Sequence, residues 1–428
     1  MDNLNLMHPR DQIILIMQRI YGYSMTTTSG GNLSIIDEDN NIWITPASVD
    51  KGTLQSKDIV CVKQDGKIIG NYKPSSEFPF HLSIYKDRPD IKAILHAHPP
   101  ALVSFSIVHK IPNTRIIPQA QYICGDIGYA KYRLPGSKNL GDIIAQIFNK
   151  GFNIVILENH GIVSSGKNLF EAFQRFETLD FCARIIIKGS TLGKIQTLSR
   201  DQLDLSKQNK NKLNEFVPEI HTSKEKELRN IICIMIQRSY KQQLITSTEG
   251  TFSCRINENS FVITPYGKDR KYLEIEDLVL IKDDKRESGK NPSRSVLLHK
   301  TIYKKQPEIN AVIIAHPPNI MAFGISGTEF NTRTIPESYV VLRDIKVFPY
   351  GTQFLNIDKV SAVLGPKNPV IIFENDCVIT CGRDLLQAYD RLEVAEFSAK
   401  SLIASKSIGD LSSITENQIQ EINKAFSI

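Results

Sequence analysis

Ile94-Leu95-His96-Ala97-His98-Pro99-Pro100 closes an apolar run that starts at Ile91, and this pattern predicts a buried strand that the two prolines end. Side chains at positions i and i+2 of a strand point to the same face, so we expect His96 and His98 to project side by side. Neutral imidazoles held in this way are good ligands for zinc or a similar divalent ion. Two histidines satisfied within the core or at the surface fit the same spacing, and the rest of the chain has to separate these readings.

The composition is that of an ordinary globular protein. The 428 residues are 41% hydrophobic and 23% charged, which suggests two to three domains. The formal net charge is +6, but no dense basic block with interleaved aromatic residues occurs, so we expect no nucleic-acid partner. The seven scattered cysteines form no CxxC pair and read as reduced thiols. We see neither a signal peptide nor an apolar run of about 18 residues, so we expect a cytoplasmic protein with no membrane partner.

The chain contains an internal repeat with a period of just over half its length. Ile44-Thr45-Pro46 recurs as Ile263-Thr264-Pro265, and His98-Pro99-Pro100 recurs as His316-Pro317-Pro318. A period this long indicates a duplicated domain and not a solenoid. We therefore predict a first domain over residues 1–205, a polar linker over 206–223 and a second domain over 224–428.

Each copy alternates helix-like and strand-like segments. Periodicity in the first copy predicts helices over 9–22, 77–87, 139–150 and 169–187, and strands over 33–36, 41–45, 93–96 and 154–157. A hairpin is expected around Asp65-Gly66, and Ser75 or Ser76 is expected to cap the helix that starts at Glu77. This mixed order predicts an α/β layered fold with a central sheet and flanking helices.

Three further signals accompany the two histidines. Glu77 follows Pro74-Ser75-Ser76 at a helix start, where a solvated glutamate is also common. Asn159-His160-Gly161 follows a buried strand, and its histidine has an equally plain structural reading. Ser75 and Ser76 sit where helix N–H groups favour a phosphate, or simply cap the helix. Together the chain offers three nitrogens and one carboxylate that suit a divalent metal, namely His96, His98, His160 and Glu77.

The repeat provides a test of this ligand set. Three of the four ligand candidates are lost in the second copy, as Glu77 becomes Ser295, His96 becomes Ile314 and His160 becomes Asp376. The motifs that look like scaffold are shared by both copies. Joint loss of the ligands indicates a metal site that is kept in one copy and dismantled in the other. His81 persists as His299, so we interpret it as a packing or supporting residue.

Five motifs in register over residues 10–190 resemble the class II aldolase/adducin family, with a degenerate second copy over 225–405. These motifs are Ser29-Gly30-Gly31-Asn32-Leu33-Ser34, Ile44-Thr45-Pro46, Pro74-Ser75-Ser76-Glu77, His96-Ala97-His98-Pro99-Pro100 and Asn159-His160-Gly161. The resemblance implies two α/β/α layered domains, each with a central, mainly antiparallel sheet. It also implies Zn²⁺, or else Mn²⁺ or Co²⁺, on the three histidines, with Glu77 as ligand and acid/base.

The resemblance further implies a phosphate pocket and a tyrosine. The phosphate would be cradled by Gly31, Asn32, Ser75 and Ser76, together with Ala47-Ser48, where the family often has threonine-glycine. A family tyrosine that donates a proton from a neighbouring subunit matches Tyr122, for which simple packing is the alternative. The second copy has Tyr339 at the equivalent place, and the family forms rings. We therefore expect a homo-oligomer, a dimer of tandem chains that mimics a tetramer, in which Tyr339 completes a first-copy site.

The resulting expectation is a metal-dependent lyase. It would cleave a ketose 1-phosphate reversibly to dihydroxyacetone phosphate and an aldehyde. The same scaffold also supports a sugar-phosphate epimerase, a dehydratase or a decarboxylase. A second class of hypothesis is a non-catalytic, adducin-like assembly module, which the complete ligand set of the first copy argues against.

Overall fold

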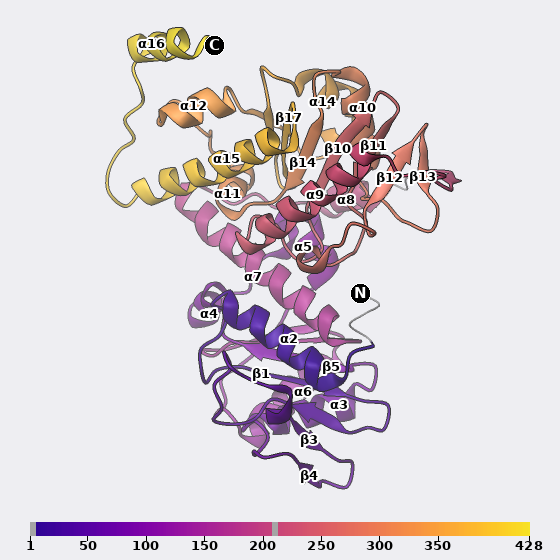
Figure 1. Cartoon of the computed structure of the whole chain (residues 1–428). Coiled ribbons are helices and arrows are strands. Elements are labelled where there is room, and N and C mark those ends of the chain that lie inside the picture. Colours follow the sequence, from indigo (N-terminus) through magenta and orange to yellow (C-terminus); the bar gives the residue numbers. More distant parts are fainter. Residues whose placement is uncertain (1–5, 208–212) are drawn as a thin grey trace. The chain divides into compact units, whose positions relative to one another are not determined.

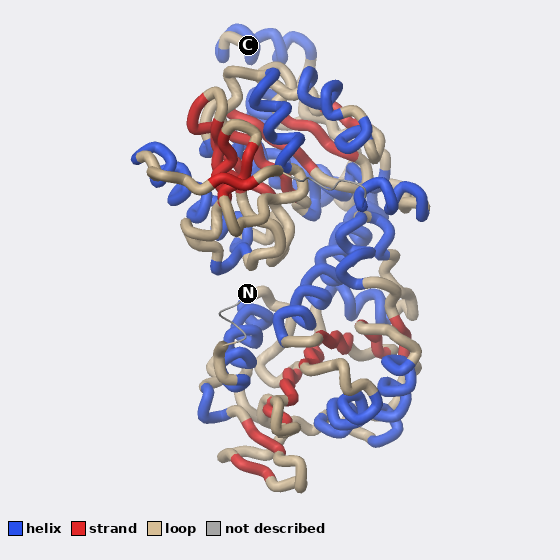
Figure 2. Tube along the Cα trace, turned by 90° about the vertical axis from the view of Figure 1, so that its right-hand side faces the viewer, coloured by secondary structure: helices blue, strands red, loops and turns tan. Residues whose placement is uncertain are grey.

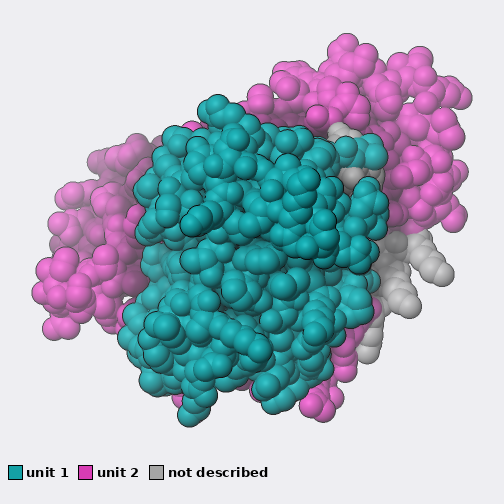
Figure 3. Space-filling view, turned by 90° about the horizontal axis from the view of Figure 1, so that it is seen from below, with its two compact units in different colours: residues 1–114, 119–184 teal, residues 115–118, 185–428 magenta. Residues whose placement is uncertain are grey.

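The computed structural model describes residues 6–207 and 213–428 (Figure 1). The chain forms two compact units, residues 1–114 with 119–184, and residues 115–118 with 185–428 (Figure 3). Part of the predicted linker, residues 208–212, lies outside the described residues. The domain boundaries predicted from the repeat stay a prediction.

The first unit is built on a sheet in the order β4-β3-β2-β1-β5-β8-β7-β6, antiparallel except for the β6–β7 pair. Its strands are β1 (Asn32–Ile36), β2 (Ile42–Ile44), β3 (Val60–Val62), β4 (Ile68–Ile69), β5 (Ala93–Ala97), β6 (Gly128–Ala130), β7 (Ile154–Leu157) and β8 (Ile162–Gly166). Its helices are α2 (Pro9–Gly22), α3 (Phe78–Asp87), α4 (Pro100–Ile107), α5 (Pro118–Cys124), α6 (Lys138–Asn149) and α7 (Leu169–Leu192), the last of which runs on into residues of the second unit.

Helices cover both faces of this sheet. Leu95 of β5 belongs to the apolar core shared with α2 and α7, whereas its neighbour Ile94 belongs to the core shared with α3 and α6. Successive strand residues face opposite sides, so a central strand with two apolar faces needs a helical layer on each. The first unit is therefore a three-layer α/β/α domain with β5 near its centre (Figures 1 and 2).

The second unit repeats this plan in the order β15-β16-β17-β14-β10-β11-β12-β13-β9. Only the β15–β16 and β13–β9 pairs are parallel. Its strands are β9 (Glu215–Phe216), β10 (Thr251–Asn257), β11 (Ser260–Ile263), β12 (Val279–Lys282), β13 (Lys285–Glu287), β14 (Ala311–Ala315), β15 (Lys346–Phe348), β16 (Val370–Phe373) and β17 (Val378–Gly382). Its helices are α8 (Arg200–Lys207), α9 (Ser223–Lys241), α10 (Val296–Lys305), α11 (Pro318–Ser326), α12 (Pro336–Leu342), α13 (Thr352–Leu355), α14 (Ile357–Val363), α15 (Leu385–Ser405) and α16 (Glu416–Phe426).

These two sheets confirm the predicted α/β class, and the predicted first-copy helices and strands all form within a few residues of their expected ends. The predicted cap of α3 is wrong. Glu77 itself occupies the N-cap position without capping through its side chain, and the Ser75 hydroxyl accepts from the Glu77 N–H at 3.3 Å. The helix begins at Phe78, so both serines precede the N-cap position, and the Glu77 carboxylate does not cap because it contacts His96. None of the described helices is long and apolar enough to cross a membrane.

Candidate active site

The two histidines of the opening stretch lie at the end of β5, as predicted. His96 is fully buried on the strand, and His98 follows it just before α4 begins at Pro100. The ring centroids of His96 and His98 are 4.7 Å apart. His160 joins them from the turn between β7 and β8, and the metal-binding nitrogens of all three rings lie within 4.8 Å of one another. The structure thus brings three predicted ligands together.

The turn that carries His160 depends on its neighbours. Asn159 adopts a left-handed φ of 54°, a conformation that asparagine tolerates better than most residues. A Cβ atom at Gly161 would lie 2.5 Å from both the Ala97 carbonyl oxygen and Cδ2 of His98. Only glycine therefore lets this turn approach the end of β5, and the His160 N–H is held there by the Ser106 hydroxyl at 3.0 Å.

Glu77 completes the cluster from the start of α3. One carboxylate oxygen, Oε2, lies 3.1 Å from Nε2 of His96, and the other, Oε1, lies 3.7 Å from Nε2 of His160. Burial alone would raise the pKa of Glu77, but His96, then His160 and the Asn32 amide, outweigh it and hold this pKa well below its usual range. Burial would likewise lower the pKa of His96, and the Glu77 carboxylate outweighs it so that this pKa is raised. Glu77 is therefore an anion in contact with a buried imidazole.

The other two rings are neutral near pH 7. Burial, reinforced by the neighbouring His96, lowers the pKa of His98 to about 3 and that of His160 to about 4. Nδ1 of His96 lies 2.8 Å from the Ile162 carbonyl oxygen, which fixes the proton on Nδ1 in the neutral ring and turns Nε2 toward the cluster. This is the arrangement that a metal-ligating histidine requires.

The donor set fits a divalent metal ion. Nε2 of His98 and Oε1 of Glu77 are buried and find no hydrogen-bond partner among the described residues. Nε2 of His96 lies 3.1 Å from Glu77 Oε2, but this contact is an ion pair without the alignment of a hydrogen bond. Buried polar atoms without hydrogen bonds are costly, so three that converge on one point call for a ligand. Three imidazole nitrogens and a carboxylate are a ligand set that zinc accepts.

The residues expected to hold a phosphate lie on neighbouring loops. Pro46 and Pro74 form an isolated bridge, and the Ala47 N–H donates to the Lys73 carbonyl at 3.0 Å, which sets the loop carrying Ser48 against the loop carrying Ser75 and Ser76. Ser48 and Ser76 are exposed, whereas Ser75 is buried. Gly31, with a φ of 73°, and Asn32 lead into β1, whose Asn32 pairs with His96 of β5. These loops are therefore brought to the same end of the sheet as the histidines.

The two predicted tyrosines are both half-buried on short helices. Tyr122 lies on α5, and Tyr339 lies on α12 of the second unit. The Tyr339 hydroxyl donates to Oδ1 of Asn423 on α16 at 3.0 Å.

Sequence reasoning missed a buried hydrogen-bond chain behind Glu77. Asn32 Nδ2 donates to Glu77 Oε2 at 2.7 Å, and Oδ1 of the same amide lies 2.5 Å from Nε2 of His81. Nδ1 of His81 meets the Ser34 hydroxyl at 2.6 Å, and Ser34 meets the Tyr85 hydroxyl at 2.7 Å. The signal was present in the spacing, because residues i and i+2 share a strand face and residues i and i+4 share a helix face.

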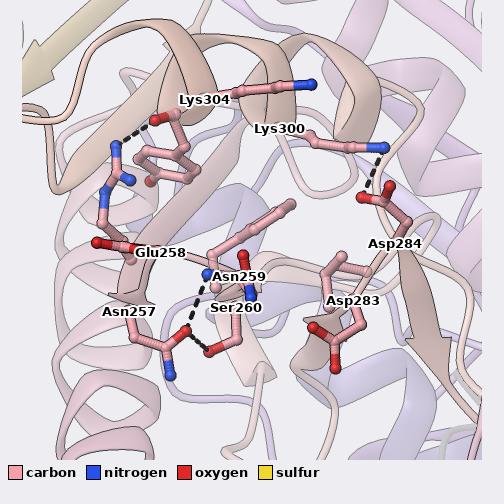
Figure 4. Close-up of a pocket in the computed structure, with 12 residues that line it drawn as sticks. Asn257, Glu258, Asn259, Ser260, Asp283, Asp284, Lys300 and Lys304 are labelled. Atoms are coloured by element: carbon pink, nitrogen blue, oxygen red, sulfur yellow. Dashed lines mark hydrogen bonds and ion pairs between the residues drawn. The ribbon is translucent and has the colours of Figure 1, made fainter.

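A pocket of about 440 Å³ in the second unit is a different kind of site (Figure 4). It lies between α10 and the turns that join β10 to β11 and β12 to β13. Its charges are largely neutralised within the wall, as in the 2.6 Å pair of Lys300 with Asp284. The pocket contains none of the predicted site residues.

Comparison with known proteins identifies the family of the chain. The model of the class II aldolase and adducin N-terminal domain matches residues 11–187 and again residues 230–403. The chain belongs to this family and carries two copies of its domain. The comparisons support an enzyme of the class II aldolase type, of a family that generally depends on a divalent metal and acts on sugar phosphates.

Individual relatives match one domain's length of the chain. An L-fuculose phosphate aldolase of Methanocaldococcus jannaschii is 33% identical over 178 residues, which are 42% of this chain and 95% of the relative. A 3-oxo-tetronate 4-phosphate decarboxylase of Pectobacterium atrosepticum is 32% identical over 199 residues, 45% of this chain and 90% of the relative. A solved structure of an L-fuculose 1-phosphate aldolase covers 46% of this chain and 93% of its own, with 30% identity and a TM-score of 0.42.

Proposed function

We propose that the first copy is a metal-dependent lyase that cleaves a ketose 1-phosphate reversibly to dihydroxyacetone phosphate and an aldehyde. The observation that carries this proposal is the convergence of three histidines and Glu77 on one point, with three buried ligand atoms left without hydrogen bonds. Relatives of about one domain's length that are named L-fuculose phosphate aldolase support it. The second copy lacks three of the four ligands, and its described residues form no histidine cluster of this kind.

The metal in this proposal is one divalent ion per chain, Zn²⁺ in the first place, with Mn²⁺ and Co²⁺ as the alternatives. It would be held by His96, His98, His160 and Glu77. When bound, such an ion supplies Lewis-acid stabilisation of the negative charge that develops on substrate oxygens during carbon–carbon cleavage. The buried carbonyl of Ile162 keeps His96 in the tautomer that this binding needs.

The substrate phosphate is proposed to rest on the loops beside the metal ligands. Backbone N–H groups at the start of α3 favour an anion, and exposed Ser76 and Ser48 offer hydroxyls there. Gly31 and Asn32 supply the opposite wall, and Ser75 shapes the turn through its bond to the Glu77 N–H. This arrangement would orient the phosphorylated end of the sugar and place the carbon to be deprotonated or protonated near Glu77.

Two proton transfers remain for side chains. Glu77, an anion at pH 7, would take up and return the proton on the dihydroxyacetone phosphate side. A tyrosine hydroxyl would serve the aldehyde-side oxygen, and the candidates are Tyr122 and Tyr339. We favour Tyr339 supplied within a dimer of tandem chains. Turnover that survives Tyr339→Phe but disappears in Tyr122→Phe would reject that choice.

The proposal is tested by a screen of ketose 1-phosphates for aldehyde release, with and without a chelator, alongside metal analysis of the purified chain. We expect about one divalent ion per chain, and turnover that the chelator abolishes and added Zn²⁺ restores. A chain that binds no metal under these conditions would reject the lyase and support an assembly module.

A decarboxylase is the second candidate. It is favoured by relatives named 3-oxo-tetronate 4-phosphate decarboxylase, which match at 30–32% identity over most of their length. Both reactions leave an electron pair on a carbon beside a carbonyl, so the same ligands and the same anionic Glu77 would serve either. Release of CO₂ from a 3-oxo acid phosphate, with no aldehyde from any ketose 1-phosphate, would decide for this candidate.

A further inference from the structure

The hydrogen-bond chain behind Glu77 runs in one direction. His81 is fully buried and burial lowers its pKa to about 3, so its ring is neutral and carries one proton. A proton on Nε2 matches the Asn32 carbonyl oxygen and leaves Nδ1 to accept from Ser34, which in turn accepts from Tyr85. Every donor then points toward the Glu77 carboxylate, and bonds aligned in this way reinforce one another.

The second copy keeps the serine, histidine and tyrosine of this hydrogen-bond network but lacks the asparagine and the glutamate. Ser253 lies 2.7 Å from Nδ1 of His299 and 2.6 Å from the Tyr303 hydroxyl, which reproduces the first-copy geometry. Thr251 stands where the first copy has Asn32, and its hydroxyl turns to Ser293 at 2.7 Å. Nε2 of His299 consequently has no hydrogen-bond partner among the described residues.

This difference separates two roles of one motif. The serine, histidine and tyrosine tie strand to helix in both copies, so that part serves the fold. The asparagine occurs only where a glutamate follows at the metal cluster, and its amide spends one donor and its acceptor on Glu77 and His81. A side chain that only cradled a phosphate would have no reason to be clamped in this way.

We propose that Asn32, held by His81, is a positioning residue that fixes the Glu77 carboxylate toward the metal ligands. This inference rests on the proposed function, in which Glu77 binds the metal and moves a proton. It assigns the Asn32 side chain to Glu77 in addition to any contact with phosphate. His81 becomes a supporting residue for chemistry, whereas its counterpart His299 supports structure alone.

The test uses the full chain and three variants. Asn32→Thr copies the second copy at a position where threonine is known to fit, and His81→Leu removes the clamp. His299→Leu is the matched control, because it removes an equally buried histidine with the same serine and tyrosine neighbours but no asparagine beyond it. Each protein is loaded with Co²⁺, and its visible absorption spectrum, its Co²⁺ affinity and its steady-state kinetics are measured.

We expect Asn32→Thr and His81→Leu to change the Co²⁺ spectrum and to lower metal affinity or kcat by roughly 10- to 100-fold, the usual cost of losing an outer partner of a ligand. In His81→Leu, which leaves every proposed phosphate-pocket residue in place, the KM for the phosphorylated substrate should change little. His81→Gln, whose amide can still donate to Asn32, should recover most of the loss, and His299→Leu should leave spectrum and kcat as in the wild type.

Two results would overturn the inference. One is an Asn32→Thr protein with a wild-type spectrum and kcat but a raised KM, which assigns Asn32 to the phosphate alone. The other is a His81→Leu protein no different from His299→Leu. The Co²⁺ spectrum can be measured without turnover. A wild type that binds Co²⁺ but cleaves no sugar phosphate would therefore reject the lyase proposal and would still allow the role of Asn32 and His81 to be tested. A wild type that binds no Co²⁺ sinks both.

Discussion

The two copies share a central strand, β5 in the first and β14 in the second, but they differ in the residues beside the histidine that follows it. Around His98 the first copy has glycine at positions 30 and 161, where a Cβ atom would lie 3.0 Å from Nδ1 and 2.5 Å from Cδ2 of that ring. Around His316 the second copy has Glu249 and Cys377 at the corresponding positions. The first copy thus keeps room for the His98 ring, whereas the second copy has side chains at both positions.

The charged residues around His316 in the second copy also differ from those around His98 in the first copy. Arg294 stands in place of a first-copy serine and lies 3.7 Å from Glu249. Burial, with a contribution from Arg294, lowers the pKa of His316 to about 4, and Nδ1 of this ring has no hydrogen-bond partner among the described residues. The comparison teaches that the histidine at the strand end is compatible with the fold alone, whereas its companions occur only in the copy for which we propose a metal site.

The substitution with the largest expected effect gives the first copy the residue that the second copy has at position 314. His96→Ile should fold, because Ile314 occupies the same strand position with 8% of its surface exposed. It removes a buried ligand, so we expect bound metal to fall from about one ion per chain to none. Activity should fall by more than the roughly 100-fold that losing an outer partner costs.

Metal analysis by emission spectroscopy and a turnover assay check this expectation. Ile314→Val in the second copy is the control, and it should change neither quantity. Full metal content in His96→Ile would mean that the histidine cluster is not the metal site.

Glu77→Gln should have the next largest effect. The amide keeps the length of the side chain but cannot accept and return a proton, so kcat should fall by roughly 10²- to 10⁴-fold. The three histidines remain, and metal should still bind, with lower affinity. Ser295→Ala at the corresponding position of the second copy should leave kcat unchanged. An unaltered kcat in Glu77→Gln would remove this residue from the proton transfer.

The clustering of the candidate ligands was predictable because it leaves two marks in the sequence. His96 and His98 alternate along an apolar strand, and three of the four candidates disappear together from a copy that keeps its scaffold. The layered fold was predictable from the periodicity of the apolar residues. A continuous apolar strand such as β5 is buried on both faces, so it needs a layer of helices on each side. Both signals can be read from one segment of the sequence, or from one segment and its counterpart in the other copy.

What escaped prediction depends on distances between segments far apart in the chain. α3 begins at Phe78, so Glu77 and not a serine lies at its N-cap, and the Glu77 carboxylate contacts His96 and Asn32 instead of capping the helix. The need for glycine at position 161 arises from the approach of one turn to the end of another strand. Neither follows from local propensity, because tertiary contacts outweigh it at a site built for a ligand.

Gly161→Cys tests the room around His98 and should have a moderate effect. The added side chain must displace the Ala97 carbonyl or the His98 ring, and overpacking of this kind costs roughly 1–3 kcal/mol of stability. Metal affinity should fall with the displacement of His98. Cys377→Gly in the second copy should lower stability through lost packing but leave metal binding intact. A Gly161→Cys protein that binds Co²⁺ as tightly as the wild type would show that the turn has more freedom than its contacts suggest.

A buried cation behind the loops provides the finest comparison between the copies. Lys51 donates to the Pro46 carbonyl at 2.7 Å, and the corresponding Arg270 donates to the Pro265 carbonyl at 3.0 Å. Lys51 is 3% exposed, and this burial lowers its pKa from 10.5 to about 8. Burial lowers the pKa of Arg270 as well, but only to about 10.

These values predict a pH dependence that Lys51 confers and an arginine does not. Between pH 8 and pH 10.5 the unfolded chain still holds a proton that folded Lys51 has released, so the free energy of unfolding should rise with pH in this window. The full rise is about 1.4 kcal/mol for each unit of pKa difference, and it is absent below pH 8, where both states are protonated.

Denaturant unfolding of wild type, Lys51→Met and Lys51→Arg at pH 7.5 and pH 9, two values chosen to bracket about one unit of this window, measures the difference. Other groups titrate equally in all three proteins, so only the wild type should gain stability relative to Lys51→Met on going to the higher pH. Lys51→Arg should follow Lys51→Met in its pH profile, because a guanidinium whose pKa is about 10, like that of Arg270, keeps its proton at both of these pH values. Parallel profiles for all three would mean that the Lys51 ammonium is not desolvated in the folded chain, and its contact with Pro46 would then be a surface contact of little consequence.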